Sequence, residues 1–96
     1  MAGFPRLRTD QPMPSASTPT PDRIRDLIDG QLIELSAGFG AEDDLFEAGL
    51  DSMAIMQLLL LIEENFGVEI PMGEVTRDNF HTTTAITRLV AEKQTA

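Results

Sequence analysis

One serine stands between an acid and a methionine at the start of the most apolar segment of the chain. The segment reads GLDSMAIMQLLLLIEENFG and begins at residue 49. The hydroxyl of Ser52 has three possible uses. It can cap a helix, which contributes about 1 kcal/mol. It can act as a hydrolytic nucleophile. It can also accept a modifying group, because a helix N-terminus favours an attached anion such as a phosphodiester.

Hydrolysis is the weakest of these interpretations. A nucleophilic serine needs a base and an acid that orients the base. His81 is the only histidine of the chain, and the residues around Ser52 do not form the G-x-S-x-G turn of serine hydrolases. We therefore expect no catalytic residue, and capping and modification remain as the alternatives for Ser52.

Cysteine is absent from the chain, which excludes disulfides and thiolate metal sites. We expect no bound metal, and any thiol chemistry must come from an attached group. The net charge is −9, and from Asp26 to Thr76 there are twelve acids but no Lys or Arg. This distribution repels a phosphate backbone, so nucleic acid is excluded as a partner. It favours a partner with a basic protein surface.

The length of 96 residues predicts one folded domain. Residues 1–20 contain four of the six prolines and few, aperiodic apolar residues, which predicts a disordered arm followed by a domain over residues 21–96. No run of eighteen apolar residues could span a membrane, and no secretory signal is recognisable at the N-terminus. We expect a cytoplasmic monomer.

Helical spacing of apolar residues predicts an all-α domain, a small four-helix bundle with three main helices and a short third one. The first helix should begin at the cap Thr20, continue through Leu35, and end at Gly38 or Gly40. A long loop then leads to Asp51. The apolar side chains of that loop are expected to pack onto the bundle; they are Leu45, Phe46 and Leu50.

The second helix should run from Ser52 to Phe66, with Asp51 or Ser52 as its cap and Gly67 as its end. Pro71 excludes helix immediately before it, so a short turn is expected over MGEV. The last helix should begin near the cap Thr82 and bury three apolar side chains, which are Ile86, Leu89 and Val90.

Two apolar faces are predicted for the second helix. A core stripe recurs at helical spacing and comprises Ile55, Leu58, Leu59, Ile62 and Phe66. Met53, Met56 and Leu60 fall on another side, and a domain of this size has too little chain to cover a helix completely. We expect these three side chains to be exposed as a docking face. A polar or acidic rim borders them, formed by Gln57, Glu63 and Glu64.

The segment DDLFEAGLDSMAIMQLLLLIEENFGVEIP resembles the centre of acyl and peptidyl carrier proteins. The resemblance implies an acyl-carrier-like helical bundle and identifies Ser52 as the attachment site of 4′-phosphopantetheine from coenzyme A. It identifies Asp51 as the motif acid that assists the modifying synthase and its magnesium. It also implies that the docking face and acidic rim contact partner enzymes. Gln57 departs from the acid that fatty-acid carriers often have at this position.

The resemblance implies a non-catalytic carrier that holds its cargo as a thioester. The expected partners are a phosphopantetheinyl transferase, an acyl- or aminoacyl-loading ligase, and a downstream acyltransferase or synthase. GLDSM together with VTRDNF favours a discrete aminoacyl or acyl carrier of polyketide or nonribosomal-type antibiotic biosynthesis. A D-alanyl carrier for teichoic acid modification is the second interpretation, and an unmodified acidic helical adaptor that binds a basic partner is the third.

Overall fold

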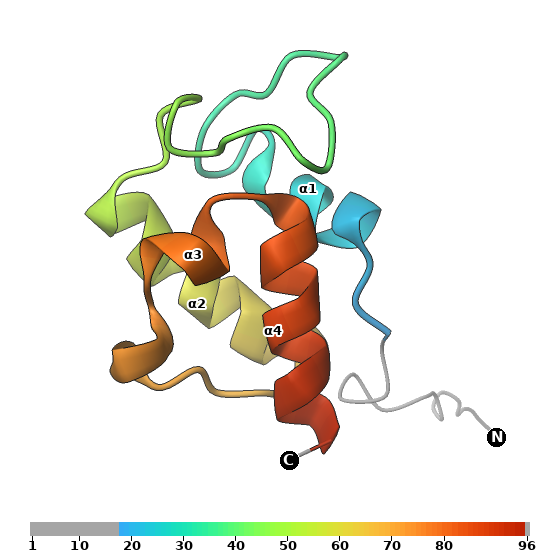
Figure 1. Ribbon diagram of the computed structural model, residues 1–96, viewed down its shortest axis with the longest axis vertical. Coiled ribbons are helices and arrows are strands. Elements are labelled where there is room, and N and C mark those ends of the chain that lie inside the picture. Colours follow the sequence, from blue (N-terminus) through green and yellow to red (C-terminus); the bar gives the residue numbers. More distant parts are fainter. Residues whose placement is uncertain (1–17, 96) are drawn as a thin grey trace, which may run out of the picture.

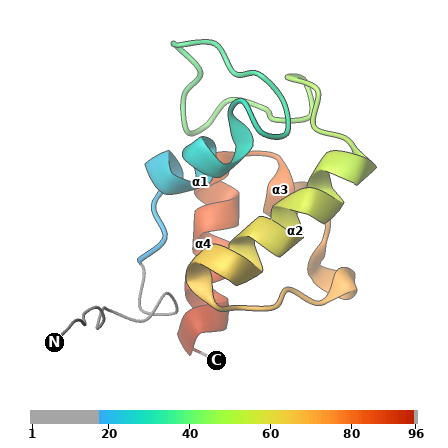
Figure 2. The same cartoon turned by 180° about the vertical axis from the view of Figure 1, so that it is seen from behind.

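The computed structural model describes residues 18–95, and these residues form a small helical bundle. The main helices are α1 (Pro21–Ile28), α2 (Ser52–Phe66) and α4 (Thr83–Thr95). A 3-10 turn, η3 (Met72–Glu74), and the short helix α3 (Arg77–Phe80) lie between α2 and α4. Figure 1 shows α3 and α4 in front of α2, and the reverse view in Figure 2 shows α2 crossing the other side of the bundle. The predicted all-α fold is confirmed.

Most helix ends follow the predicted caps. The side chain of Thr20 accepts a hydrogen bond from the backbone N–H of Arg23, with Pro21 at the first position of α1. Thr82 caps α4 in the same way, through a 3.0 Å bond from the N–H of Ala85. Gly67, with φ of 71°, ends α2 in the left-handed conformation that glycine adopts without strain.

The first helix is shorter than predicted. It ends at Ile28 and not near Gly38 or Gly40, because the next two residues leave the helical conformation. Asp29 is extended and its carboxylate accepts a 2.9 Å hydrogen bond from the N–H of Leu35. Gly30 has φ of 81°. A side-chain bond of this kind competes with the helical ladder, and Leu35 still reaches the core from the loop.

The loop of residues 29–51 packs onto the bundle, as predicted from its apolar residues. Leu45 is completely buried and Leu50 is nearly so, while Phe46 is half-buried against the core. The N–H of Leu45 donates a hydrogen bond to the carbonyl of His81 at 2.7 Å. This bond holds the loop against the connection between α3 and α4. Figure 1 shows this loop closing one end of the molecule.

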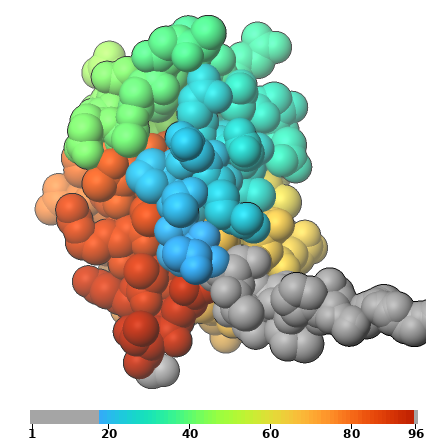
Figure 3. Space-filling view, turned by 90° about the vertical axis from the view of Figure 1, so that its right-hand side faces the viewer, coloured from blue at the N-terminus to red at the C-terminus, as the bar shows by residue number. Residues whose placement is uncertain are grey.

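The core lies between α1, α2 and α4, which all contact one another. Figure 3 shows α1 lying directly against α4 on one face of the molecule. The fully buried side chains include Phe66 of α2 and Phe80 of α3, together with Ile24, Ile28, Leu45, Leu58, Ile62, Ile86 and Val90. Packing against α1 and α4 therefore fixes the direction of α2 and the position of its N-terminus.

The predicted arm over residues 1–20 lies largely outside the described residues, which begin at Thr18. Thr20 belongs to the fold, because its side chain caps α1. No helix within residues 18–95 is long and apolar enough to cross a membrane.

Candidate functional site

Ser52 is the first residue of α2, and its side chain is exposed. The structure decides between the two predicted caps. Asp51 is the cap, because its Oδ1 accepts a 2.9 Å hydrogen bond from the N–H of Ala54. The Ser52 hydroxyl makes no hydrogen bond to any other residue of the described chain. It is therefore accessible from outside the bundle.

The surroundings of Ser52 favour an attached anion. No acidic residue lies in the first turn of α2. The N-terminus of a helix carries partial positive charge on its unpaired N–H groups, and this charge stabilises anions within the first turn. Asp51 uses one of those N–H groups through its capping bond.

His81 is held by backbone carbonyls at the end of α3. Its Nδ1 lies 3.1 Å from the carbonyl oxygens of Arg77 and of Asp78, at the end of α3. A carbonyl oxygen can only accept, so Nδ1 carries the proton in these contacts. Within the described residues no acid orients the ring, and neither ring nitrogen forms a hydrogen bond with Ser52.

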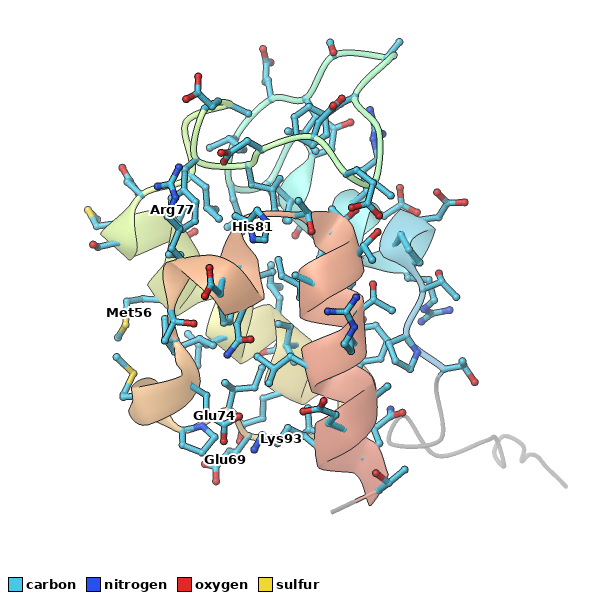
Figure 4. All side chains as sticks on the ribbon, viewed as in Figure 1. Met56, Glu69, Glu74, Arg77, His81 and Lys93 are labelled. Carbon is cyan, nitrogen blue, oxygen red and sulfur yellow. The ribbon has the colours of Figure 1, made fainter. Side chains whose placement is uncertain are left out.

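A groove of about 310 Å³ opens beside Ser52. It lies where the start of α2 faces the end of the long loop and the segment from η3 to α3. Its lining is mainly apolar, with one guanidinium: Phe46, Ser52, Ile55, Met56, Met72, Val75, Thr76 and Arg77. In Figure 4, Met56 and Arg77 lie on the same side of the bundle, near the start of α2.

A second groove, of about 460 Å³, continues along α2 toward its C-terminus. Its lining is Leu59, Leu60, Glu63, Glu69, Ile70, Pro71 and Met72. Met72 lines both grooves, so they meet at this side chain. One elongated surface thus runs from Ser52 to the acidic residues near the end of α2.

The side chains predicted for the docking face are exposed. The exposed fractions are 73% for Met53, 54% for Met56 and 61% for Leu60. Gln57, Glu63 and Glu64 are exposed as well. Glu63 borders the groove shared with Met72, whereas Gln57 and Glu64 line a separate hollow on the other flank of Leu60. The predicted rim therefore lies on both sides of the docking face.

The sequence interpretation missed Met72, which is 63% exposed and completes the row of exposed large apolar side chains in the described chain. Its position after Pro71 in a predicted turn was the available signal, because a methionine on a turn has few neighbours to cover it. Two residues of the predicted core stripe are also less buried than expected. Ile55 is only partly buried, because it lines the groove beside Ser52. Leu59 is only partly buried, because it lines the second groove, whereas Leu58 is fully buried.

Arg77 was not singled out from the sequence either. Its Nη2 donates to Oδ2 of Asp44 at 3.2 Å, and its guanidinium lies 4.8 Å from the centre of the Phe46 ring. These contacts join α3 to the loop that precedes α2. The signal in the sequence was its position as the first base after the acidic middle of the chain.

Within residues 18–95 no cluster of three or more His, Asp or Glu side chains is arranged to hold a metal ion. Asp51 stands alone beside Ser52, with one carboxylate oxygen engaged in the helix cap.

Comparison with known proteins places these features in context. Residues 22–90 match the family model described as "Phosphopantetheine attachment site". The D-alanyl carrier proteins of Streptococcus pyogenes serotypes M5 and M1 are each 39% identical over 56 residues, which are 57% of this chain and 71% of theirs.

A solved structure is also similar. It is the crystal structure of Bradyrhizobium japonicum glycine:[carrier protein] ligase complexed with glycylated carrier protein. The similarity has a TM-score of 0.55 and 27% sequence identity, and it covers 72% of this chain and 90% of the matched chain. The resemblance drawn from the GLDSM segment is confirmed by these matches, and the predicted helical bundle agrees with them.

Proposed function

Because this chain belongs to the family of proteins that carry a phosphopantetheine attachment site, we propose that Ser52 is the attachment residue and that the cargo is an aminoacyl group. Proteins of this family are non-catalytic carriers that receive 4′-phosphopantetheine covalently. The observation that carries the assignment is the exposed Ser52 hydroxyl, which no other described residue engages, at the start of α2 and beside an apolar groove.

The residues around Ser52 fit the group. The phosphodiester would lie at the N-terminus of α2, where no acid of the first helical turn repels it. The apolar lining of the adjacent groove, including Met56 and Val75, can cover the aliphatic part of the arm. When bound, the group supplies the terminal thiol that this cysteine-free chain lacks. During modification the Ser52 oxygen would form a bond to the phosphorus of coenzyme A while the phosphoanhydride bond breaks and adenosine 3′,5′-bisphosphate leaves. The Ser52 proton would pass to a base of the transferase.

Asp51 has two separable tasks in this proposal. Its Oδ1 caps α2 and so fixes where Ser52 points. Its second oxygen forms no hydrogen bond in the described chain and is exposed, which suits the recognition of a transferase and its magnesium. The carrier thus supplies a positioned hydroxyl and an acid, and the partner supplies the catalytic machinery.

A small amino acid is the cargo that the relatives favour. The matched Streptococcus proteins are D-alanyl carriers, and the matched structure contains a glycylated carrier with its ligase. We propose an aminoacyl-loading ligase as the first partner after the transferase, and an acyltransferase or synthase as the acceptor. A tether raises the effective concentration of the cargo at each partner to about the millimolar range. A cytoplasmic location is part of this proposal.

The docking face would serve these partners in turn. Met56, Leu60 and Met72 offer adaptable apolar contact, and Glu63 and Glu64 offer charge that steers a basic partner. Natural-product biosynthesis of the polyketide or nonribosomal type is our first candidate setting. Teichoic acid modification is the second, and it is supported by the 39% identity to D-alanyl carriers.

The test uses intact mass spectrometry. The full chain is incubated with coenzyme A, Mg²⁺ and a phosphopantetheinyl transferase of broad specificity. We expect one added phosphopantetheine in the wild-type protein and none in Ser52→Ala. Thr87→Ala serves as a matched hydroxyl control on α4. Absence of the added mass from the wild-type protein would contradict the attachment, and its presence in Ser52→Ala would contradict the site. Glycine and D-alanine are then offered with their ligases and ATP to compare the two cargo classes.

A further inference from the structure

The groove beside Ser52 contains a single charged side chain, Arg77. The other described bases are placed elsewhere. Arg25 pairs with Asp29 at 3.5 Å, Lys93 pairs with Glu74, and Arg23 lies over the ring of Phe66. Arg88 is exposed on α4 and does not line this groove. Figure 4 shows Lys93 beside Glu74, lower in the view than Arg77. Arg77 is therefore the guanidinium available to an anion attached at Ser52.

The present partner of Arg77 holds it weakly. The ion pair with Asp44 has an N–O distance of 3.2 Å, and 64% of the Arg77 side chain and 32% of the Asp44 side chain are exposed. Exposed ion pairs contribute little to stability, because water and salt compete for both charges. The guanidinium also lies 4.8 Å from the centre of the Phe46 ring, which holds it over the groove. This contact does not use the N–H groups of the guanidinium, so they can bind another acceptor.

Asp44 does not depend on Arg77 for its own position. Its Oδ1 accepts hydrogen bonds from the N–H groups of Phe46, at 2.8 Å, and of Glu47, at 3.3 Å. Its Oδ2 is the atom that meets Arg77. Loss of the ion pair would therefore leave the turn of the loop in place and return Oδ2 to solvent.

We propose that Arg77 is a binding residue for the phosphodiester on Ser52, and that it exchanges Asp44 for that phosphodiester when the protein is modified. This inference rests on the proposed attachment at Ser52. A guanidinium binds phosphate oxygens through two parallel N–H groups, which a single carboxylate oxygen at 3.2 Å does not use. The N-terminus of α2 adds its own attraction for the same anion.

The exchange has two consequences. The attached group is directed from Ser52 along the groove toward Arg77, so the start of the arm takes a preferred direction. Asp44 also becomes an unpaired acid on the surface of the loop after modification. A partner that reads the charge of this loop would thereby distinguish the unmodified protein from the modified one.

The test compares the full chain before and after modification by NMR, with intact mass confirming the added group. In the wild-type protein, modification should shift the side-chain Nε–H resonance of Arg77 and the carboxyl carbon resonance of Asp44. The ³¹P resonance of the phosphodiester should differ between the wild-type protein and Arg77→Gln, and the difference should shrink as salt rises. Arg88→Gln, which removes an exposed base of α4, should give the wild-type ³¹P resonance. Arg77→Lys keeps the charge but loses the two parallel N–H groups of the guanidinium. Its ³¹P resonance should lie between those of the wild-type protein and Arg77→Gln.

Two results would overturn the inference. One is a modified wild-type protein in which the Arg77 and Asp44 resonances are unchanged; this comparison needs no variant and is independent of how Arg77→Gln folds. The other is a ³¹P resonance that is the same in Arg77→Gln and the wild-type protein. Either result leaves the attachment at Ser52 intact, because the added mass is measured separately. Absence of the added mass from the wild-type protein would contradict the attachment and this inference together.

Discussion

The two faces of α2 should respond in opposite ways to substitution, and two positions within one helical turn can show this. Leu58 is fully buried in the core, whereas Met56 is 54% exposed beside Ser52. Replacing Leu58 with alanine removes buried methyl groups and leaves a cavity, which costs about 2–5 kcal/mol. Replacing Met56 with lysine removes only the contacts of its covered half, and the lysine stem retains part of them, so the cost should be about 1 kcal/mol or less.

These costs are large relative to the stability of a domain of this size. At about 0.05–0.15 kcal/mol per residue, the domain would have a free energy of unfolding of about 4–12 kcal/mol. A change of 1 kcal/mol shifts the melting temperature of a small domain by about 4–8 °C. Leu58→Ala should therefore lower the melting temperature by at least about 8 °C, and Met56→Lys by about 8 °C at most.

The assay measures thermal and urea unfolding by circular dichroism together with the rate of ligase loading after modification. Leu58→Met is the matched control, since it nearly conserves volume and should cost less than about 1.5 kcal/mol. Met56→Lys should slow loading while the protein stays folded. A loss of 2 kcal/mol or more in Met56→Lys would refute the assignment of its side chain to the docking face. A loss below 1 kcal/mol in Leu58→Ala would refute the assignment of Leu58 to the core.

Three further predictions concern charge, the cap and the N-terminal segment. Exchanging Glu63 and Glu64 for lysine should slow loading at low salt, and the difference from the wild-type protein should fade as salt shortens the screening length below about 8 Å; a salt-independent difference would argue against steering. Asp51→Ala removes the helix cap and should lower the free energy of unfolding by about 0.5–2 kcal/mol. Asp51→Asn should keep the cap but be modified more slowly. Equal modification rates of Asp51→Asn and the wild-type protein would exclude a role for the charge. A chain that begins at Thr18 should melt within a few degrees of the full chain, and a large loss of helical signal would show that residues 1–17 contribute to the fold.

Local chemistry was enough to predict the helices whose ends depend on one or two residues. Thr20, Asp51 and Thr82 cap their helices through their own side chains, and Gly67 ends α2 through its own backbone freedom. The motif around Ser52 is likewise local, so the family and the proposed attachment site were accessible from the sequence. The first helix was misjudged because apolar spacing continued beyond Ile28, while Asp29 and Gly30 had already redirected the backbone.

The sequence by itself determined the class of the protein, the position of the serine and the periodic pattern of α2. Only the tertiary structure decided which apolar side chains remain exposed, because exposure depends on what the rest of the chain covers. Met72 joins the exposed apolar side chains because η3 lies beside α2, and Leu59 is only partly buried because a groove opens next to it. Arg77 reaches the groove of Ser52 because the long loop and α3 pack together through Asp44 and Phe46, 33 and 31 positions away. Contacts across such separations depend on how the helices pack, and no local pattern in the sequence records them.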